Sequence, residues 1–296
     1  MKNSSKFFLL LLAMRPKQWI KNLVLFAPLV FSERLLIVSD LLRTSLAFLL
    51  FCLLAGAVYL INDISDRNRD RVHPEKCRRP IASGNLPVGT AAGAAVFLLL
   101  ASLLGGVWWF DRAFLLILSL YFVLNLFYSF WLKRIVIIDV MSIAGGFLLR
   151  AMAGAVSISV LISPWLILCT ILLSLFLGFC KRRQELTALA GRASDHRGIL
   201  SEYSTRFLDQ MISIVTTATL MAYTFYTLSP EVEDKLGTSW LYLTVPFVLY
   251  GIFRYLYLVY RLEQGGNPTR ALLTDLPLLL AVTLWGLTVI LILYPL

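Results

Sequence analysis

The chain has 296 residues, of which 59% are hydrophobic and 15% are charged. Ordinary soluble domains have roughly 45–50% apolar and about 25% charged residues, so the composition excludes a typical water-soluble domain. The net charge is +10, which in a membrane protein reports orientation and anionic partners, and no nucleic acid partner is expected. The four cysteines form no C-x-x-C pair, so neither a zinc site nor a disulfide framework is expected.

Apolar runs long enough to cross the ~30 Å hydrocarbon layer as helices recur along the chain. Residues 1–19 precede them, and we expect an interfacial segment there rather than a cleaved signal peptide, because Arg15, Lys17 and Lys21 stand where a cleavage site would be. The pattern predicts a single all-helical membrane domain over residues 1–296. Its nine spans are expected near residues 20–37, 45–62, 88–109, 113–131, 135–157, 163–180, 208–229, 238–260 and 271–294.

Basic residues gather on alternate connections between these spans, whereas the connection 229–239 on the other side carries three acids. The positive-inside rule therefore places the N-terminus in the cytoplasm and the C-terminus outside. The two long connections, 63–87 and 181–206, lie on the cytoplasmic side and hold most of the polar residues. We expect a cavity that opens to the cytoplasm and laterally to lipid.

An acidic motif ends the second predicted span, with Asn62, Asp63, Asp66 and Asp70 at helical spacing. If the helix continues, these four side chains share one face. Oxygen-only ligands suit Mg²⁺, which binds a few carboxylates together with substrate phosphates. The alternative is a solvated helix end whose acids pair with neighbouring arginines. Ionisable groups at a membrane boundary are usually functional, which favours the metal.

This motif, followed by Arg79-Pro80-Ile81-Ala82-Ser83-Gly84, resembles the UbiA superfamily of intramembrane prenyltransferases. The opening Arg15-Pro16-Lys17-Gln18-Trp19 and the blocks at 128–133, 139–151, 181–186 and 203–211 are similar to its decaprenyl-phosphate phosphoribosyltransferase branch. The resemblance implies a bacterial inner-membrane enzyme of cell-envelope polysaccharide precursor synthesis. With Mg²⁺ as cofactor, such an enzyme transfers 5-phosphoribose from phosphoribosyl pyrophosphate to a polyprenyl (decaprenyl) phosphate, and pyrophosphate leaves.

Site residues are expected from the motifs and the resemblance together. The predicted metal ligands are Asn62, Asp63, Asp66 and Asp70. The predicted catalytic residues are Asp63, Asp66, Asp70, Lys133 and Asp139. The predicted substrate contacts are Lys17, Asn62, Arg79, Tyr128, Lys133, Arg150, Lys181, Arg182 and Glu185.

The connection after the sixth span departs from the wider superfamily. Enzymes that ionise a prenyl diphosphate carry a second Asp-rich motif there, whereas this chain has Lys181, Arg182 and Arg183, with only Glu185 as an acid. A basic cluster suits a phosphate that binds without metal, because arginine offers a bidentate fork and lysine a point charge. A positive-inside anchor explains the cluster equally well.

Arg150 lies inside the fifth predicted span, 11 residues after Asp139. Helical geometry places the two on one stripe but ~16 Å apart along the axis, so they cannot pair directly. A charged arginine at this depth needs a polar cavity or a partner. We interpret Arg150 as a ligand of a substrate phosphate or sugar; an internal structural contact is the alternative.

Two rival functions follow from the same residues. A UbiA-type prenyltransferase would move a prenyl group from a prenyl diphosphate to an aromatic acceptor, but it would need a second carboxylate cluster. A secondary transporter would gather ionisable residues near the bilayer midplane in repeated halves. Here most acids lie at one face, and the sequence shows no internal repeat.

Overall fold

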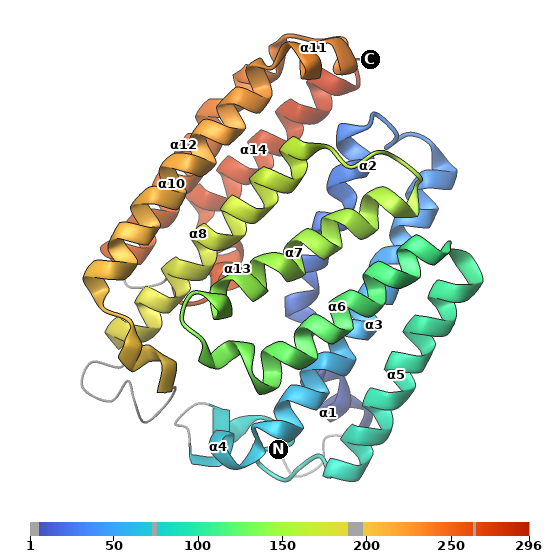
Figure 1. The fold of residues 1–296 in the computed structure, drawn as a ribbon, viewed down its shortest axis with the longest axis vertical. Coiled ribbons are helices and arrows are strands. Elements are labelled where there is room, and N and C mark those ends of the chain that lie inside the picture. Colours follow the sequence, from blue (N-terminus) through green and yellow to red (C-terminus); the bar gives the residue numbers. More distant parts are fainter. Residues whose placement is uncertain (1–5, 73–75, 189–197, 263–264, 296) are drawn as a thin grey trace.

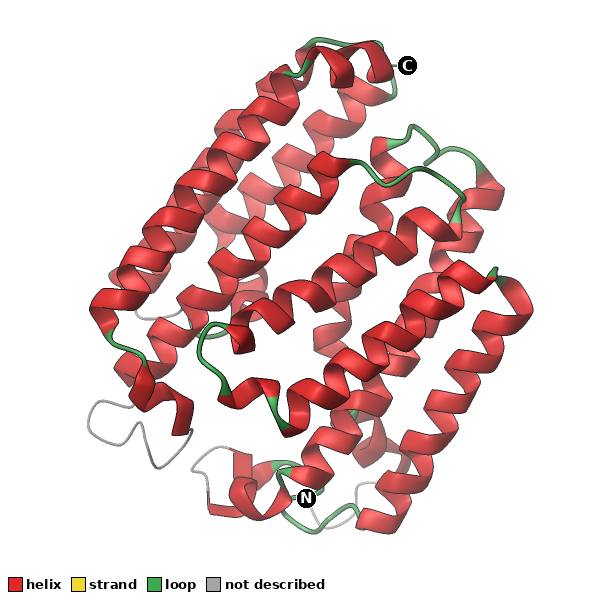
Figure 2. Ribbon diagram, viewed as in Figure 1, coloured by secondary structure: helices red, strands yellow, loops and turns green. Residues whose placement is uncertain are grey.

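The computed structural model describes residues 6–72, 76–188, 198–262 and 265–295. Within these ranges every regular element is a helix, so the all-helical prediction is confirmed (Figure 2). The predicted interfacial segment 1–19 is described from residue 6 onward. There α1, Lys6–Ala13, packs against α3, Val38–Ser65, through Leu9 and Ala13.

In the described part of the chain, eight helical segments are long and apolar enough to cross a membrane, with mean hydropathies from 1.3 to 2.5 over their best 18 residues. This confirms a multi-pass membrane protein. They correspond to the second through ninth predicted spans. They are α3, α5 (Val88–Trp109), α6 (Arg112–Phe130), α7 (Ile138–Ser157), α8 (Pro164–Ala188), α10 (Thr205–Leu228), η5 with α12 (Trp240–Tyr260) and α14 (Leu276–Leu293).

The first predicted span has a different form. Residues Pro16–Phe26 form a 3₁₀ helix, η1, and Ala27–Phe31 form the short α-helix α2. Proline at the first turn of each element removes an N–H donor and marks a break. A 3₁₀ helix rises ~2.0 Å per residue, so the two elements together still extend about 30 Å. They run from the end of the bundle that carries α1 to the end that carries α2 (Figure 1). The chain therefore makes this crossing, but not as the predicted α-helix over 20–37.

The short elements gather at the two ends of the bundle. Figure 1 shows α4, Arg67–Val72, at the same end as α1, whereas α11, Pro230–Leu236, lies at the opposite end. We call the end with α1 and α4 the motif end. The remaining short elements are η2 (Lys76–Arg78), η3 (Leu132–Arg134), η4 (Gly198–Glu202) and α13 (Pro268–Thr274).

The two predicted long connections contain more helix than expected. The connection 63–87 begins with the last turn of α3 and includes α4 and η2. The connection 181–206 was expected to be a loop, but α8 continues through its first two turns to Ala188. The basic residues at 181–183 therefore occupy fixed positions on a helix.

The first crossing lies inside the bundle, packed against both α3 and α7. Leu25 and Leu29 are fully buried. At Gly154 of α7, a Cβ atom would overlap the carbonyl group of Leu25. Glycine at this position lets the two backbones approach closely, as small residues commonly do between membrane helices.

Candidate functional site

The acidic motif lies at the motif end, where α3 stops and α4 starts. α3 ends at Ser65, Asp66 leaves the helix with φ −90° and ψ 4°, and α4 begins at the next residue. Asp63 and Asp70 are 2% and 4% exposed. Carboxylates buried this deeply need partners of opposite charge.

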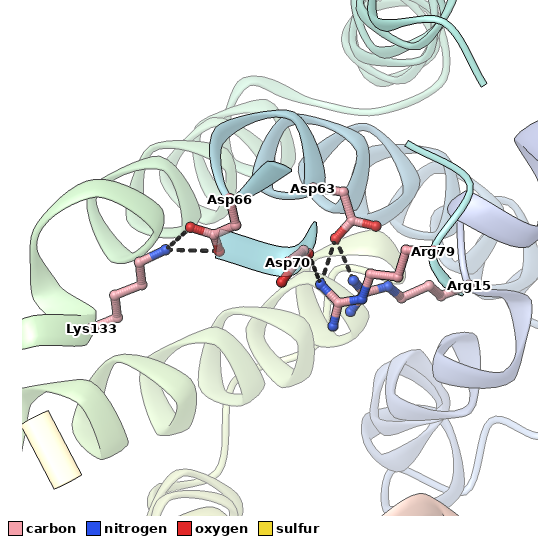
Figure 3. A network of polar contacts seen from close by, with 6 residues as sticks. All are labelled: Arg15, Asp63, Asp66, Asp70, Arg79 and Lys133. Carbon is pink, nitrogen blue, oxygen red and sulfur yellow. Dashed lines mark hydrogen bonds and ion pairs between the residues drawn. The ribbon is translucent and has the colours of Figure 1, made fainter. Parts of the chain in front are cut away.

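Basic side chains from distant parts of the chain supply those partners (Figure 3). Nη1 of Arg79 donates to Asp63 at 3.1 Å and to Asp70 at 2.6 Å, so one guanidinium nitrogen bridges two carboxylates. Arg15 also donates to Asp63. Asp66 points the other way and accepts two hydrogen bonds from Nζ of Lys133, at 2.9 and 3.0 Å.

The prediction of one shared face is therefore wrong for Asp66. Because the helix breaks at this residue, its carboxylate turns toward η3 and away from the Asp63–Asp70 pair. Across the described residues, no three acidic, cysteine or histidine side chains gather into a group that could hold a metal ion. Asn62 is half-buried beside Asp63, and Lys17 is exposed on η1.

A second polar network joins α6, α7, α8 and the residue after η4 near the same end. Asp139 accepts hydrogen bonds from Nε of Arg182 at 2.5 Å and from the Tyr203 hydroxyl at 2.7 Å. Arg182 also donates to Glu185 at 2.6 Å and to the Tyr128 hydroxyl at 3.3 Å. The side chains of Asp139 and Arg182 are 0% and 1% exposed. These contacts support a structural role for this pair, which the sequence had assigned to catalysis and substrate binding.

The other basic residues of α8 differ in their surroundings. Arg183 donates to Asp209 of α10 at 2.6 Å and is covered by the Tyr260 ring. Lys181 lies 3.8 Å from Glu185, and its side chain is 39% exposed. Within the predicted basic cluster, Lys181 is thus the residue that best keeps the surface position needed for a phosphate contact.

Tyr203 was not singled out as a site residue, although it fell in one of the quoted sequence blocks. Its hydroxyl accepts a hydrogen bond from the backbone N–H of Ile137 at 2.7 Å, where φ is +68°. Burial, together with the hydrogen bond to Asp139, raises the pKa of Tyr203 above the usual phenol value. The residue therefore stays a neutral donor that holds the turn between Lys133 and α7. Because 64 residues separate Tyr203 from Asp139, their spacing in the sequence did not indicate that the two side chains are in contact.

Arg150 is buried in the interior, at 6% exposure, and its contacts are all within the protein. Nε donates to Oδ1 of Asn22 at 2.6 Å, Nη1 to the Gly146 carbonyl at 2.9 Å, and Nη2 to the Tyr121 hydroxyl at 2.6 Å. Asn22 in turn donates to Sγ of Cys52 at 3.2 Å. These contacts favour an internal structural role for Arg150 over a role as a ligand of a substrate phosphate or sugar. The signal that could have found Asn22 is a polar side chain within an apolar crossing.

The comparisons with known proteins agree with this architecture. Two proteins named decaprenyl-phosphate phosphoribosyltransferase, from Corynebacterium glutamicum and Mycolicibacterium smegmatis, are 34% and 35% identical to the chain. The matches cover 95% and 93% of this chain and 86% and 89% of those relatives.

Solved structures show the same fold. A UbiA homolog from Archaeoglobus fulgidus bound to DMAPP and Mg²⁺ superposes with a TM-score of 0.69 at 16% identity, covering 99% of this chain and all of that one. The same homolog bound to GPP and Mg²⁺ gives 0.69 over 97% and 99%. The family model described as the UbiA prenyltransferase family matches residues 24–275. The chain is therefore a membrane-embedded enzyme that belongs to the UbiA prenyltransferase family.

Proposed function

We propose that this enzyme transfers 5-phosphoribose from phosphoribosyl pyrophosphate to a polyprenyl phosphate, with release of pyrophosphate. The names of relatives that match over more than nine tenths of the chain support this reaction. The basic connections at the motif end support an orientation with that end in the cytoplasm of a bacterial cell, at the inner membrane. The product would serve cell-envelope polysaccharide precursor synthesis.

One observation in the structure carries the proposed donor site. Arg79 bridges Asp63 and Asp70, and Lys133 pairs with Asp66, so acids and bases alternate within a small region. A pyrophosphate needs cationic partners, and a hard metal ion needs oxygen ligands. The motif end contains both cationic side chains and carboxylate oxygens, and in this structure they pair with each other.

The donor chemistry of the motif fits a divalent metal. Every candidate ligand is an oxygen, and a cationic group already sits between Asp63 and Asp70. The residues that would hold Mg²⁺ are Asn62, Asp63 and Asp70, together with Asp66, whose carboxylate would have to leave Lys133 to join them. When bound, the metal would supply neutralisation of the charge that develops on the leaving pyrophosphate.

The side chains have defined tasks in this reaction. A phosphate oxygen of the lipid attacks the anomeric carbon while the bond from that carbon to the pyrophosphate oxygen breaks. Arg15, Arg79 and Lys133 are freed from the carboxylates and stabilise the negative charge of the phosphates electrostatically. A general base is not required, because a phosphate monoester is already anionic at pH 7.

The remaining predicted contacts divide between the rim and the interior. Lys17 and Lys181 keep their proposed roles as substrate contacts at the motif end. Tyr128 and Glu185 accept hydrogen bonds from Arg182, and Glu185 also lies 3.8 Å from Lys181.

The rival aromatic prenyltransferase would use a second carboxylate cluster near the end of α8. The structure has Lys181, Arg182 and Arg183 there, and the nearby Asp209 is paired with Arg183. This charge distribution favours the phosphoribosyl donor over a prenyl diphosphate that ionises at a second metal site.

The test is a transfer assay with purified protein in nanodiscs. Phosphoribosyl pyrophosphate labelled in the ribose is incubated with a short polyprenyl phosphate and Mg²⁺, and labelled lipid and pyrophosphate are expected in equal amounts. Chelation with EDTA should abolish the product, and Asp70→Asn should lower turnover by orders of magnitude. Asp234→Asn, at an exposed position of α11, is the matched control. Prenylation of an aromatic acceptor without ribosyl transfer would refute the proposal.

A further inference from the structure

Lys21 stands out among the basic residues of the bundle. It lies on η1, the crossing that packs inside between α3 and α7, and its side chain is half-buried. In the described part of the chain, no carboxylate lies within ion-pair distance of its ammonium group, and the group makes no hydrogen bond. Its neighbour in the sequence, Asn22, accepts a hydrogen bond from Arg150 of α7, and the positive charges of Arg150, Arg15 and Lys181 act on the Lys21 ammonium group.

The backbone that presents Lys21 is held firmly. Its neighbour Asn22 is 1% exposed, bonded to Arg150 of α7 and to Cys52 of α3. One turn further, Leu25 rests against Gly154. Lys21 therefore cannot leave its cationic surroundings by a shift of η1 without breaking these contacts.

Two of the cations that act on Lys21 already have acidic partners: Arg15 pairs with Asp63, and Lys181 lies 3.8 Å from Glu185. Lys21 has no acidic partner among the described residues. The partners of Arg150 are neutral, so its charge is left over. Like charges held together in a partly buried place repel, and ionisable residues at membrane depth usually mark a ligand path. An anion would balance the charges of Lys21 and Arg150.

We propose that Lys21 binds a phosphate monoester of the substrate, and that Arg150 positions Lys21 through Asn22. This inference rests on the proposed function, in which both the 5-phosphate of phosphoribosyl pyrophosphate and the head of the polyprenyl phosphate are such monoesters. A monoester carries a charge of about −1.5 to −2 near pH 7, which matches the charges of Lys21 and Arg150, since neither has an acidic partner among the described residues. Lys21 forms no ion pair with the carboxylates of the acidic motif.

The first test replaces the charge. Lys21→Met should raise the KM for one monoester substrate by about 10–100-fold, the loss expected for one charge-assisted hydrogen bond. A rise for phosphoribosyl pyrophosphate identifies the 5-phosphate as the ligand, and a rise for the polyprenyl phosphate identifies the lipid head. Lys21→Arg should restore most of the affinity. Lys6→Met, at an exposed lysine of α1, is the matched control.

A second readout does not require turnover. Ribose 5-phosphate and a short polyprenyl phosphate are added separately to the detergent-solubilised protein, and the thermal midpoint is followed. At least one should stabilise the wild type but not Lys21→Met. If neither ligand distinguishes the two proteins and neither KM changes, the proposal is refuted. A wild type that binds a monoester but transfers no ribose would refute the proposed function and leave the Lys21 site standing.

The positioning role of Arg150 has its own signature. Arg150→Met and Asn22→Ala should raise the same KM as Lys21→Met, with a smaller effect on kcat. Combining Arg150→Met with Lys21→Met should add little, because both remove one contact. Additive losses would show that Arg150 acts independently of Lys21.

Discussion

The buried pair of Asp139 and Arg182 gives the sharpest quantitative expectation. Arg182→Gln removes the cation and leaves a fully buried carboxylate whose remaining partner is the Tyr203 hydroxyl. Breaking a buried pair in this way costs about 3–5 kcal/mol. We therefore expect a loss of this size in the free energy of unfolding of Arg182→Gln.

The double variant Asp139→Asn/Arg182→Gln completes the cycle. The asparagine oxygen can still accept from Tyr203, and no charge is left unpaired, so most of the lost stability should return.

The assay is unfolding by SDS in mixed micelles, followed by tryptophan fluorescence at several pH values. Substrate KM values are measured on the same variants below their unfolding range. If Arg182 held a substrate phosphate instead, Arg182→Gln would keep its stability and lose substrate affinity. That result, or a double variant as unstable as Arg182→Gln, would refute the structural assignment.

Three further expectations concern other parts of the bundle. Gly154→Ala should destabilise the protein by about 1–3 kcal/mol, the usual range for overpacking, because its Cβ would overlap the Leu25 carbonyl; unchanged SDS resistance would contradict this packing. The raised pKa of Tyr203 means that its neutral form is favoured by folding, so stability should be complete below about pH 10 and decline above it. Tyr203→Phe should show a smaller alkaline decline than the wild type in an SDS titration, and an identical profile would refute the reasoning. Asp66→Asn should lower turnover by orders of magnitude in the ribosyl transfer assay and also lower the thermal midpoint, because the buried Lys133 loses its ion-pair partner; full activity at saturating Mg²⁺ would remove Asp66 from the site.

Much of the architecture could be predicted because hydropathy and loop charge act locally. Eight of the nine spans coincide with long apolar helices, since each run of apolar residues satisfies its own backbone hydrogen bonds in lipid. The 3₁₀ conformation of the first crossing was not predicted, because a 3₁₀ helix has no distinct hydropathy signature.

The site was predictable in its residue types and less so in its pairings. The acidic motif was visible from its spacing, but the helix break at Asp66 and the arrival of Lys133 depend on tertiary contacts. The same holds for Arg182, whose sequence context predicts an exposed basic cluster. Its burial follows from Asp139, 43 residues earlier on the neighbouring helix.

The three-residue turn of η1 sorts its side chains into rows. Residues three apart eclipse one another in a 3₁₀ helix, so Asn22 and Leu25 form one row, and both are buried. Leu23 belongs to a second row and is 51% exposed, whereas Lys21 belongs to a third. An α-helical wheel would mix these rows. An insertion of one residue within Pro16–Phe26 should therefore exchange the lipid-facing, packing and cation-bearing rows along the rest of the crossing.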